Sequence, residues 1–197
     1  SGRAVQISRL SRLLRDGNTG ERGHAATRLA VLRDRAAEMG LVAALADEAV
    51  QVRVQAALGL AACGGRNSLG SLAAAVGDRN ANVSQAALVA LEHITGHRES
   101  CDPYSHPGAR EGARRSWEAW LAAANWTDIE RDLLARAASN EPSEAQCAVE
   151  AIARIGGDAS AEWLRKAVER GDWPSLRCEL AAFRALGQVG NDAAVPV

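Results

Sequence analysis

The sequence predicts an all-α protein built from repeated pairs of helices. Aromatic residues make up 4% of the 197 residues, whereas alanine, leucine, arginine and glutamate are abundant. This composition favours helices and is poor in the β-branched and aromatic residues that strands prefer. The second observation is an internal repeat with a period of about 31 residues, which is typical of stacked helical hairpins.

The repeat is defined by four apolar or small positions in its second helix. Aligning residues 52–65 with residues 83–96, one period later, places Ala56 on Ala87 and Leu60 on Leu91. These positions fall at i, i+3, i+4 and i+7, the spacing of a buried helical stripe. The other copies of the pattern are Ala25, Arg28, Leu29 and Leu32; Ala148, Ala151, Ile152 and Ile155; and Ala182, Ala185, Leu186 and Val189.

The elements follow in a fixed order within each copy. A shorter apolar segment that ends in Asp47 or Asp78 comes first, and the second helix follows it. Glycine is expected to end the second helices, because it adopts the left-handed conformation at little cost. These glycines are Gly64, Gly65, Gly96, Gly156, Gly157 and Gly190. We expect regular repeats over 20–96, an irregular repeat with a loop over 97–126, and further repeats over 127–197.

The recurring pattern D-x4-V-R-x2-A-A-x2-L-x3-G resembles HEAT repeats, in particular the short bacterial HEAT-like kind known from phycobiliprotein lyases. The resemblance is clearest over 35–96 and weaker over 143–157 and 176–190. It implies a single armadillo-like, right-handed α-solenoid of about five to six helix pairs, one of them degenerate with an inserted loop. The resembling family includes scaffolds, adaptors and a few enzymes. The final residues, Ala193–Val197, read as the start of another helix, so we expect the chain to be part of a longer protein.

The charge balance and the cysteine pattern bear on the expected partners and location of the protein. The formal net charge of −1 gives no general electrostatic reason for a nucleic-acid or membrane partner. No stretch approaches the length of a membrane span. Four cysteines without a C-x2-C motif fit reduced thiols in a cytoplasmic setting. Cys63 and Cys178 fall on core positions of the repeat, and Cys147 is expected to pack at the helix edge.

Residues 93–106 hold the main chemical candidates. His93, His97, Cys101 and His106 have the spacing H-x3-H-x3-C-x4-H and would make a tetrahedral zinc set. Gly96 and the turn signals at Asp102-Pro103 place three of them in a loop whose geometry the sequence does not give. The alternatives are a metal site and an unliganded loop, and we expect no cofactor.

The helix after this loop carries Trp117 and Trp120 on one face, either as a stacking platform for a ligand or as packing in an irregular repeat. The segment resembles an insertion of bacterial HEAT-repeat proteins, through Ile94-Thr95-Gly96, Asp102-Pro103, Pro107 and Trp117-x2-Trp120. The resemblance implies a structural role.

Two rows of outward positions on the second helices are the expected binding surface. One row is Thr27, Leu58, Val89, Glu150 and Arg184, and the other is Val31, Ala62, His93, Arg154 and Gln188. Neither row is basic, as a surface that grips phosphates would be. An apolar and mixed-charge surface suits a protein or peptide partner.

We therefore expect a non-catalytic scaffold that binds a protein through its concave side, with six residues as the expected contacts: Leu58, Val89, His93, Glu150, Arg154 and Arg184. The HEAT-like hydroxylases use His-Glu pairs, and this chain contains no His-Glu dipeptide. One alternative is a metal-binding protein that uses the loop. Another is a nucleic-acid binder that uses the acid-free arginine set Arg3, Arg9, Arg12 and Arg15 near the start.

Overall fold

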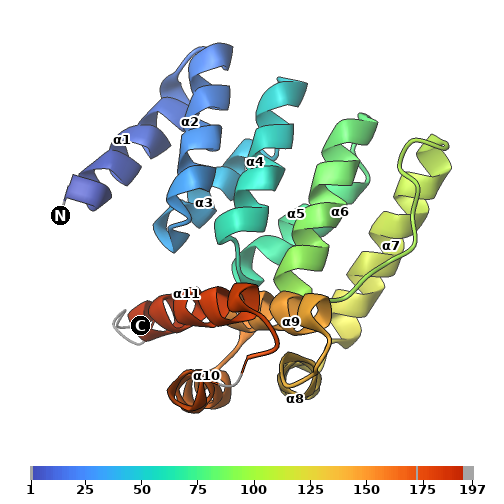
Figure 1. The fold of residues 1–197 in the computed structure, drawn as a ribbon. Helices are drawn as coiled ribbons and strands as arrows, with labels where there is room; N and C mark the ends of the chain where they lie inside the picture. Colours follow the sequence, from blue (N-terminus) through green and yellow to red (C-terminus); the bar gives the residue numbers. More distant parts are fainter. Residues whose placement is uncertain (1, 172, 193–197) are drawn as a thin grey trace. The chain divides into compact units, whose positions relative to one another are not determined.

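The computed structural model describes residues 2–171 and 173–192, apart from the side chains of residues 158 and 187–192, and over this range the protein is all-α (Figure 1). The described α-helices are α1 (Gly2–Asp16), α2 (Thr19–Leu32), α3 (Glu38–Ala44), α4 (Val50–Cys63), α5 (Leu69–Val76), α6 (Ala81–Thr95), α7 (Pro107–Ala123), α8 (Trp126–Ala137), α9 (Pro142–Ile155), α10 (Asp158–Arg170) and α11 (Leu176–Asp192). Short 3₁₀ turns at Arg35–Ala37 and Arg66–Ser68 lead into α3 and α5. The all-α prediction is confirmed. None of the helices described is both long enough and apolar enough to cross a bilayer.

The chain divides into two compact units, residues 1–92 with 97–123 and residues 93–96 with 124–197. In the first unit, α1 packs on α2, α2 and α3 pack on α4, and α5 packs on α7. Most of the predicted repeat positions form its core, because Ala56, Ala87, Leu60 and Leu91 are fully buried. Arg28 was expected on the buried stripe but is exposed, and Leu32 is half-buried. The recurrence in the sequence therefore corresponds to successive second helices of a helical repeat.

In the second unit, α8 packs on α9, and α9 and α10 pack on α11. Ala148, Ile152 and Ala182 of the predicted repeat positions are again fully buried, whereas Leu186 is half-buried. Pro142 stands at the start of α9, where its missing N–H costs no helical hydrogen bond. The predicted core position Val189 and the helix expected from Ala193 lie outside the described side chains and residues.

The glycine prediction is correct in place but only partly in conformation. Gly64, Gly96 and Gly156 each follow the last residue of a helix, yet only Gly96 is left-handed, with φ of 71°. Gly190 lies inside α11, which continues to Asp192, so the expectation that it ends this helix is wrong. At Gly96 a Cβ atom would come within 2.9 Å of Leu133, which gives a packing reason for glycine as well.

The inserted segment forms a loop over 97–106 and then the long helix α7, which packs on α5. The Asp102-Pro103 turn is present, because Tyr104 N donates to Asp102 Oδ1 at 2.9 Å and Ser105 N donates to Asp102 O at 3.3 Å. The segment thus contributes one helix and one ordered turn to the first unit.

Candidate functional site

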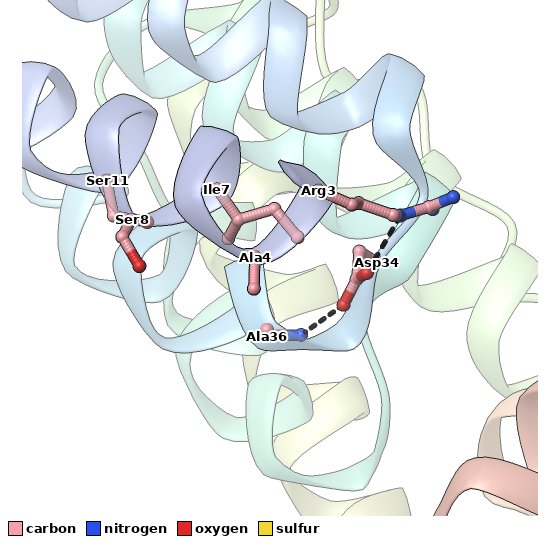
Figure 2. A pocket seen from close by; sticks show the side chains of 7 residues that line it. All are labelled: Arg3, Ala4, Ile7, Ser8, Ser11, Asp34 and Ala36. Atoms are coloured by element: carbon pink, nitrogen blue, oxygen red, sulfur yellow. Dashed lines mark hydrogen bonds and ion pairs between the residues drawn. The ribbon is translucent and has the colours of Figure 1, made fainter. Parts of the chain in front are cut away.

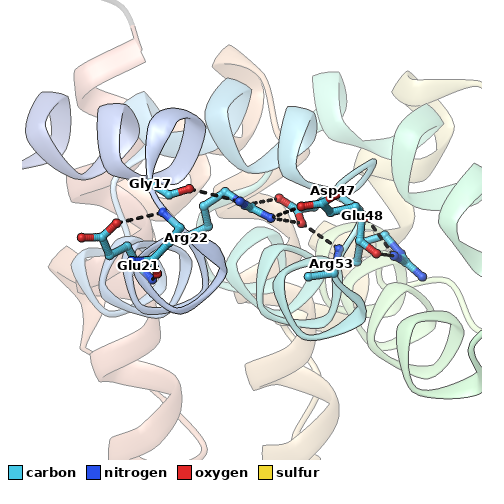
Figure 3. A network of polar contacts seen from close by, with 8 residues as sticks. Gly17, Glu21, Arg22, Asp47, Glu48 and Arg53 are labelled. Atoms are coloured by element: carbon cyan, nitrogen blue, oxygen red, sulfur yellow. Dashed lines mark hydrogen bonds and ion pairs between the residues drawn. The ribbon is translucent and has the colours of Figure 1, made fainter.

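Repeated arginine–aspartate pairs link successive hairpins of the first unit, and Figure 3 shows the first pair, Arg22 with Asp47. Arg22 donates to Asp47 through Nε at 2.7 Å and Nη2 at 2.9 Å. One period later in the chain, Arg53 donates to Asp78 in the same two-pronged way, at 2.8 Å and 3.1 Å. Such bidentate geometry is the strongest form of the arginine–carboxylate contact. We call these two pairs the arginine ladder.

Each ladder arginine also holds the turn of its own hairpin. Arg22 Nη1 donates to Gly17 O at 3.1 Å, and Arg53 Nη1 donates to Asp47 O at 2.8 Å and Glu48 O at 3.1 Å. One side chain therefore connects two consecutive interhelical turns. These guanidinium groups have structural partners and do not face an open site.

The arginine ladder lowers the pKa of Asp47. Burial opposes the charged form of Asp47, but hydrogen bonds from Arg22 and from Ala49 N outweigh it, so the pKa of Asp47 lies below its ordinary value. The hydrogen bond to Asp47 likewise raises the pKa of Arg22. Both groups are held in their charged forms, as a structural ion pair requires.

The insertion continues the ladder by another route. The next position in the arginine row is Ser84, whose Oγ donates to Val76 O at 2.5 Å. Arg110 of α7 takes over the turn contacts and donates to Asp78 O at 3.0 Å and Arg79 O at 3.3 Å. It also donates to Pro103 O at 2.7 Å and is 8% exposed. Arg110 thus binds the carbonyls that correspond, one period later, to those held by Arg53.

The metal candidates of the loop do not converge. His97 Nε2 lies 3.0 Å from Glu99 Oε1, His106 Nδ1 accepts from Ala109 N at 3.1 Å, and Cys101 Sγ donates to Ala109 O at 3.7 Å. Burial and then the charge of Asp102 raise the pKa of the Cys101 thiol, which disfavours the thiolate that a metal needs. Within residues 2–171 and 173–192, no three His, Cys, Asp or Glu side chains form a group that could hold a metal ion.

The tryptophans of α7 belong to packing. Trp117 is fully buried, and the His97 ring stacks on Trp120 with centroids 4.4 Å apart and an interplanar angle of 8°. Trp117 meets both of these rings edge-on, at 5.1 Å and 5.7 Å. Of the two predicted roles, packing of the irregular segment fits this geometry. His97 therefore helps to fasten the loop to α7.

The two rows of second-helix positions were expected to face outward, and only some of their residues are exposed. Leu58 is 41% exposed, Val89 and Glu150 are half-buried, and His93 and Arg184 are exposed. Arg154 contradicts the expected outward orientation, because it is 8% exposed and its Nη1 donates to His93 O at 3.0 Å. The end of α6 leaves backbone carbonyls without helical partners, and Arg154 fills one of them.

The first-unit members of the two rows are all uncharged and exposed or half-buried, and we call them the inner strip: Thr27, Val31, Leu58, Ala62 and Val89. Val31 is 73% exposed and Leu58 is 41% exposed, although both are apolar. α2 and α4, which carry most of the strip, pack against each other. The inner strip contains no charged residue, and the hydroxyl of Thr27 donates to Gly23 O at 3.0 Å.

The arginine set near the start is smaller than the sequence indicates. Arg3 Nε pairs with Asp34 at 3.1 Å and its Nη2 donates to Leu32 O, while Arg15 pairs with Asp16 at 2.9 Å. Residues 3–15 contain no acid, which suggested a basic patch. Asp16 follows this run directly, and Asp34 lies further along the chain. Arg9 and Arg12 remain exposed on α1. Two arginines make a weak phosphate-binding surface.

A small cavity lies beside α1 (Figure 2). Its volume is about 360 Å³, and it is lined by Arg3, Ala4, Ile7, Ser8, Ser11, Asp34 and Ala36. The Arg3–Asp34 pair closes one side, and two serine hydroxyls supply the other polar groups. The Asp34 carboxylate pairs with Arg3 and accepts from Ala36 N at 3.0 Å, so its partners lie within the lining itself.

The cysteines are all free thiols. Cys63 and Cys178 are buried as predicted, at 3% and 0% exposure. Cys147 is exposed, so the expectation that it packs is wrong. Its position corresponds to Gln55, which bonds to Thr27 of the preceding helix.

No family model matches this chain, and no curated protein matches it either. Among solved structures it is similar to an engineered protein from a structural genomics consortium, with 16% sequence identity and a TM-score of 0.42. That similarity covers 94% of this chain and 96% of the other. Its helices and their buried positions one period apart show that the chain is an all-α helical repeat protein.

Proposed function

We propose that the chain is a non-catalytic scaffold, a right-handed HEAT-like solenoid that binds a protein or peptide through its second helices. The observation that supports this proposal is the inner strip. Its members recur at the repeat spacing, remain accessible and carry no charge. Exposed apolar residues in a regular row are typical of surfaces that receive an apolar partner.

The uncharged, mostly apolar residues of the inner strip indicate which kind of segment a partner would bind with. Neighbouring helices place successive rows roughly 10 Å apart, so a bound segment would contact Val31 and Leu58 with side chains at about that spacing. An amphipathic helix or an extended segment with apolar anchors meets this requirement. We place the protein in the cytoplasm, because four cysteines without a C-x2-C motif fit that setting.

The experiment compares strip variants with a matched control. Proteins that bind the wild-type chain are identified, purified and titrated against Val31→Arg, Leu58→Arg and the control Met39→Arg. Met39 is apolar and 67% exposed but lies on α3, outside the strip. The two strip variants should weaken the Kd about tenfold or more, as hot-spot changes do, whereas Met39→Arg should leave it unchanged.

Binding that tolerates both strip variants would refute this proposal. Circular dichroism of each variant shows whether its helices are intact, so that lost binding is not confused with lost folding.

A further inference from the structure

The second helices of the first unit carry side-chain amides next to the inner strip. Gln51 and Gln55 lie four residues apart on α4, and Leu58 and Ala62 follow them on the same face of the helix. Gln51 is exposed and Gln55 is half-buried. Asn82 of α6 stands one period after Gln51 and is also exposed. We call Gln51, Gln55 and Asn82 the amide row.

Two hydrogen bonds connect the amide row to its neighbours. Thr27 Oγ1 of α2 lies 3.1 Å from Gln55 Oε1, so this amide bridges two second helices. Tyr104 OH donates to Asn82 Oδ1 at 3.0 Å. The contacted atom is the carboxamide oxygen in both residues, which leaves each NH2 group with donors for a ligand.

The helix that holds most of the amide row has no exposed charge. Arg53 is the single charged residue between Val50 and Cys63, and it pairs with Asp78 in the ladder. A carboxylate or ammonium group of a bound segment would lose water on α4 without gaining a counter-ion there. Charge complementarity therefore calls for an uncharged segment, with dipoles that match carboxamide groups.

Main-chain carbonyls are the acceptors that these donors fit. A helical partner already uses its carbonyls in its own hydrogen bonds, so the amide row would have little to bind there. A polyproline II segment has no internal hydrogen bonds, and its carbonyls need partners once a surface covers them.

The geometry of polyproline II also matches the inner strip. Three residues make one turn and advance the chain by about 9 Å, close to the roughly 10 Å between packed helices. α2 and α4 pack against each other, and they expose Val31 by 73% and Leu58 by 41%. Side chains three residues apart would therefore contact Val31 and Leu58 in turn.

We propose that the inner strip and the amide row together bind an uncharged polyproline II segment of a partner protein, with an apolar side chain at every third position. The apolar side chains contact Val31 and Leu58, and the main-chain carbonyls of the segment accept from Gln51, Gln55 and Asn82. This inference rests on the proposed function and decides between a helical and an extended partner segment.

The test selects peptides on the folded chain. A displayed library of random peptides of about 12 residues, which span roughly 37 Å as polyproline II, is selected on the wild type and counter-selected on Leu58→Arg. Uncharged sequences that contain proline and apolar residues three positions apart should be enriched.

A selected peptide is then titrated against variants of the amide row. Gln51→Leu and Gln55→Leu should each weaken the Kd about fivefold, the effect of losing one hydrogen bond. Gln6→Leu is the matched control and should leave the Kd unchanged, because Gln6 is half-buried on α1, outside the amide row. Peptides with single main-chain amides replaced by esters, which are weaker acceptors, should lose affinity for the wild type but not for the glutamine variant at the same contact.

Two results would overturn this inference and leave the proposed scaffold function standing. One is enrichment of sequences with apolar residues at the helical spacing i, i+3, i+4 and i+7. The other is peptide binding that Leu58→Arg abolishes but both glutamine variants leave unchanged. A library without any sequence that prefers the wild type over Leu58→Arg would count against both the inference and the proposed function. Circular dichroism of each variant establishes that its helices are intact.

Discussion

Arg53 shows how a single side chain can organise two turns. Its guanidinium satisfies the Asp78 carboxylate and the carbonyls of Asp47 and Glu48, while the residue itself is 5% exposed. A buried charge with so many partners cannot be removed without leaving polar groups unpaired.

Arg53→Ala should therefore destabilise the first unit by about 3 kcal/mol, since Asp78 would lose its buried counter-ion. Urea unfolding followed by hydrogen exchange of α4 and α5 would measure this loss. The control is Arg131→Ala, which removes a surface pair whose arginine side chain is 73% exposed. It should cost less than about 1 kcal/mol. Equal losses for the two variants would contradict the assigned role of Arg53.

Because of Asp47, the stability that the arginine ladder contributes depends on pH. Its pKa is lowered on folding, because hydrogen bonds from Arg22 and Ala49 N outweigh the effect of burial. A group with a lowered folded pKa stabilises the protein above its unfolded pKa, about 3.9 for aspartate. That stabilisation is lost as the pH falls from there through the folded pKa.

Asp47→Asn should be less stable than the wild type at pH 7, and the difference should shrink below about pH 4. Urea unfolding at pH 7, 5, 4 and 3 would follow it. Glu48→Gln provides the neighbouring control, because the Glu48 side chain is 83% exposed and contacts the same Arg22 at 3.2 Å. A difference between wild type and Asp47→Asn that stays constant with pH would rule out this linkage.

Two glycines in helices have opposite surroundings. A Cβ atom on Gly59 of α4 would lie 3.0 Å from both methyl groups of Leu41, whereas one on Gly70 of α5 would meet nothing within 4 Å. Glycine weakens a helix interior in both cases, but only at Gly59 does it allow close packing with the paired helix.

Gly70→Ala should stabilise the protein by about 0.5–1 kcal/mol, the usual gain from replacing a helical glycine. Gly59→Ala should give less or become destabilising, because Leu41 must move. Thermal unfolding of the two variants side by side tests this order. An equal gain at both positions would show that Leu41 adapts without cost.

The helices and their buried faces are the part of this fold that sequence patterns predict best. Ala56, Leu60 and their equivalents follow from local periodicity, which depends only on helix geometry. The repeat pattern misplaces Arg154, because it aligns this residue with Ala62, whose side chain is too short to bend back. Its partner, the His93 carbonyl, lies 61 residues away in the chain, and local patterns carry no information on such contacts.

The candidate site was harder to predict for the same reason. The recurrence of Asp47 and Asp78 was visible, but their pairing with Arg22 and Arg53 depends on how one turn faces the next helix. The role of Arg110 depends on the path of the loop before it. The exposure of Phe183 depends on which side chains the neighbouring helices cover, and local patterns do not give that.

At the scale of the whole molecule, each unit has its own buried positions. Leu60 in the first unit and Ile152 in the second occupy the same place in the repeat and are both fully buried. Helical repeats exchange contacts mainly with their neighbours in the chain.

Leu60→Ala should cost about 3 kcal/mol and speed amide exchange in α3 and α4, with little change in α9 and α11. Ile152→Ala should produce the reciprocal pattern. Native-state hydrogen exchange resolved by peptide would measure both. Uniform loosening of all helices by either variant would show that the two units unfold as one.

The arginine ladder also restricts which lengths of sequence can be inserted or deleted without breaking an ion pair. Any block of one full period cut between Arg22 and Asp78 contains one arginine and one aspartate of the ladder. Duplicating such a block would create a new joint chemically identical to the old ones, wherever the cut is made. Unequal recombination could thus lengthen or shorten this part of the protein in whole steps, while other insertion lengths would leave a buried cation without its anion.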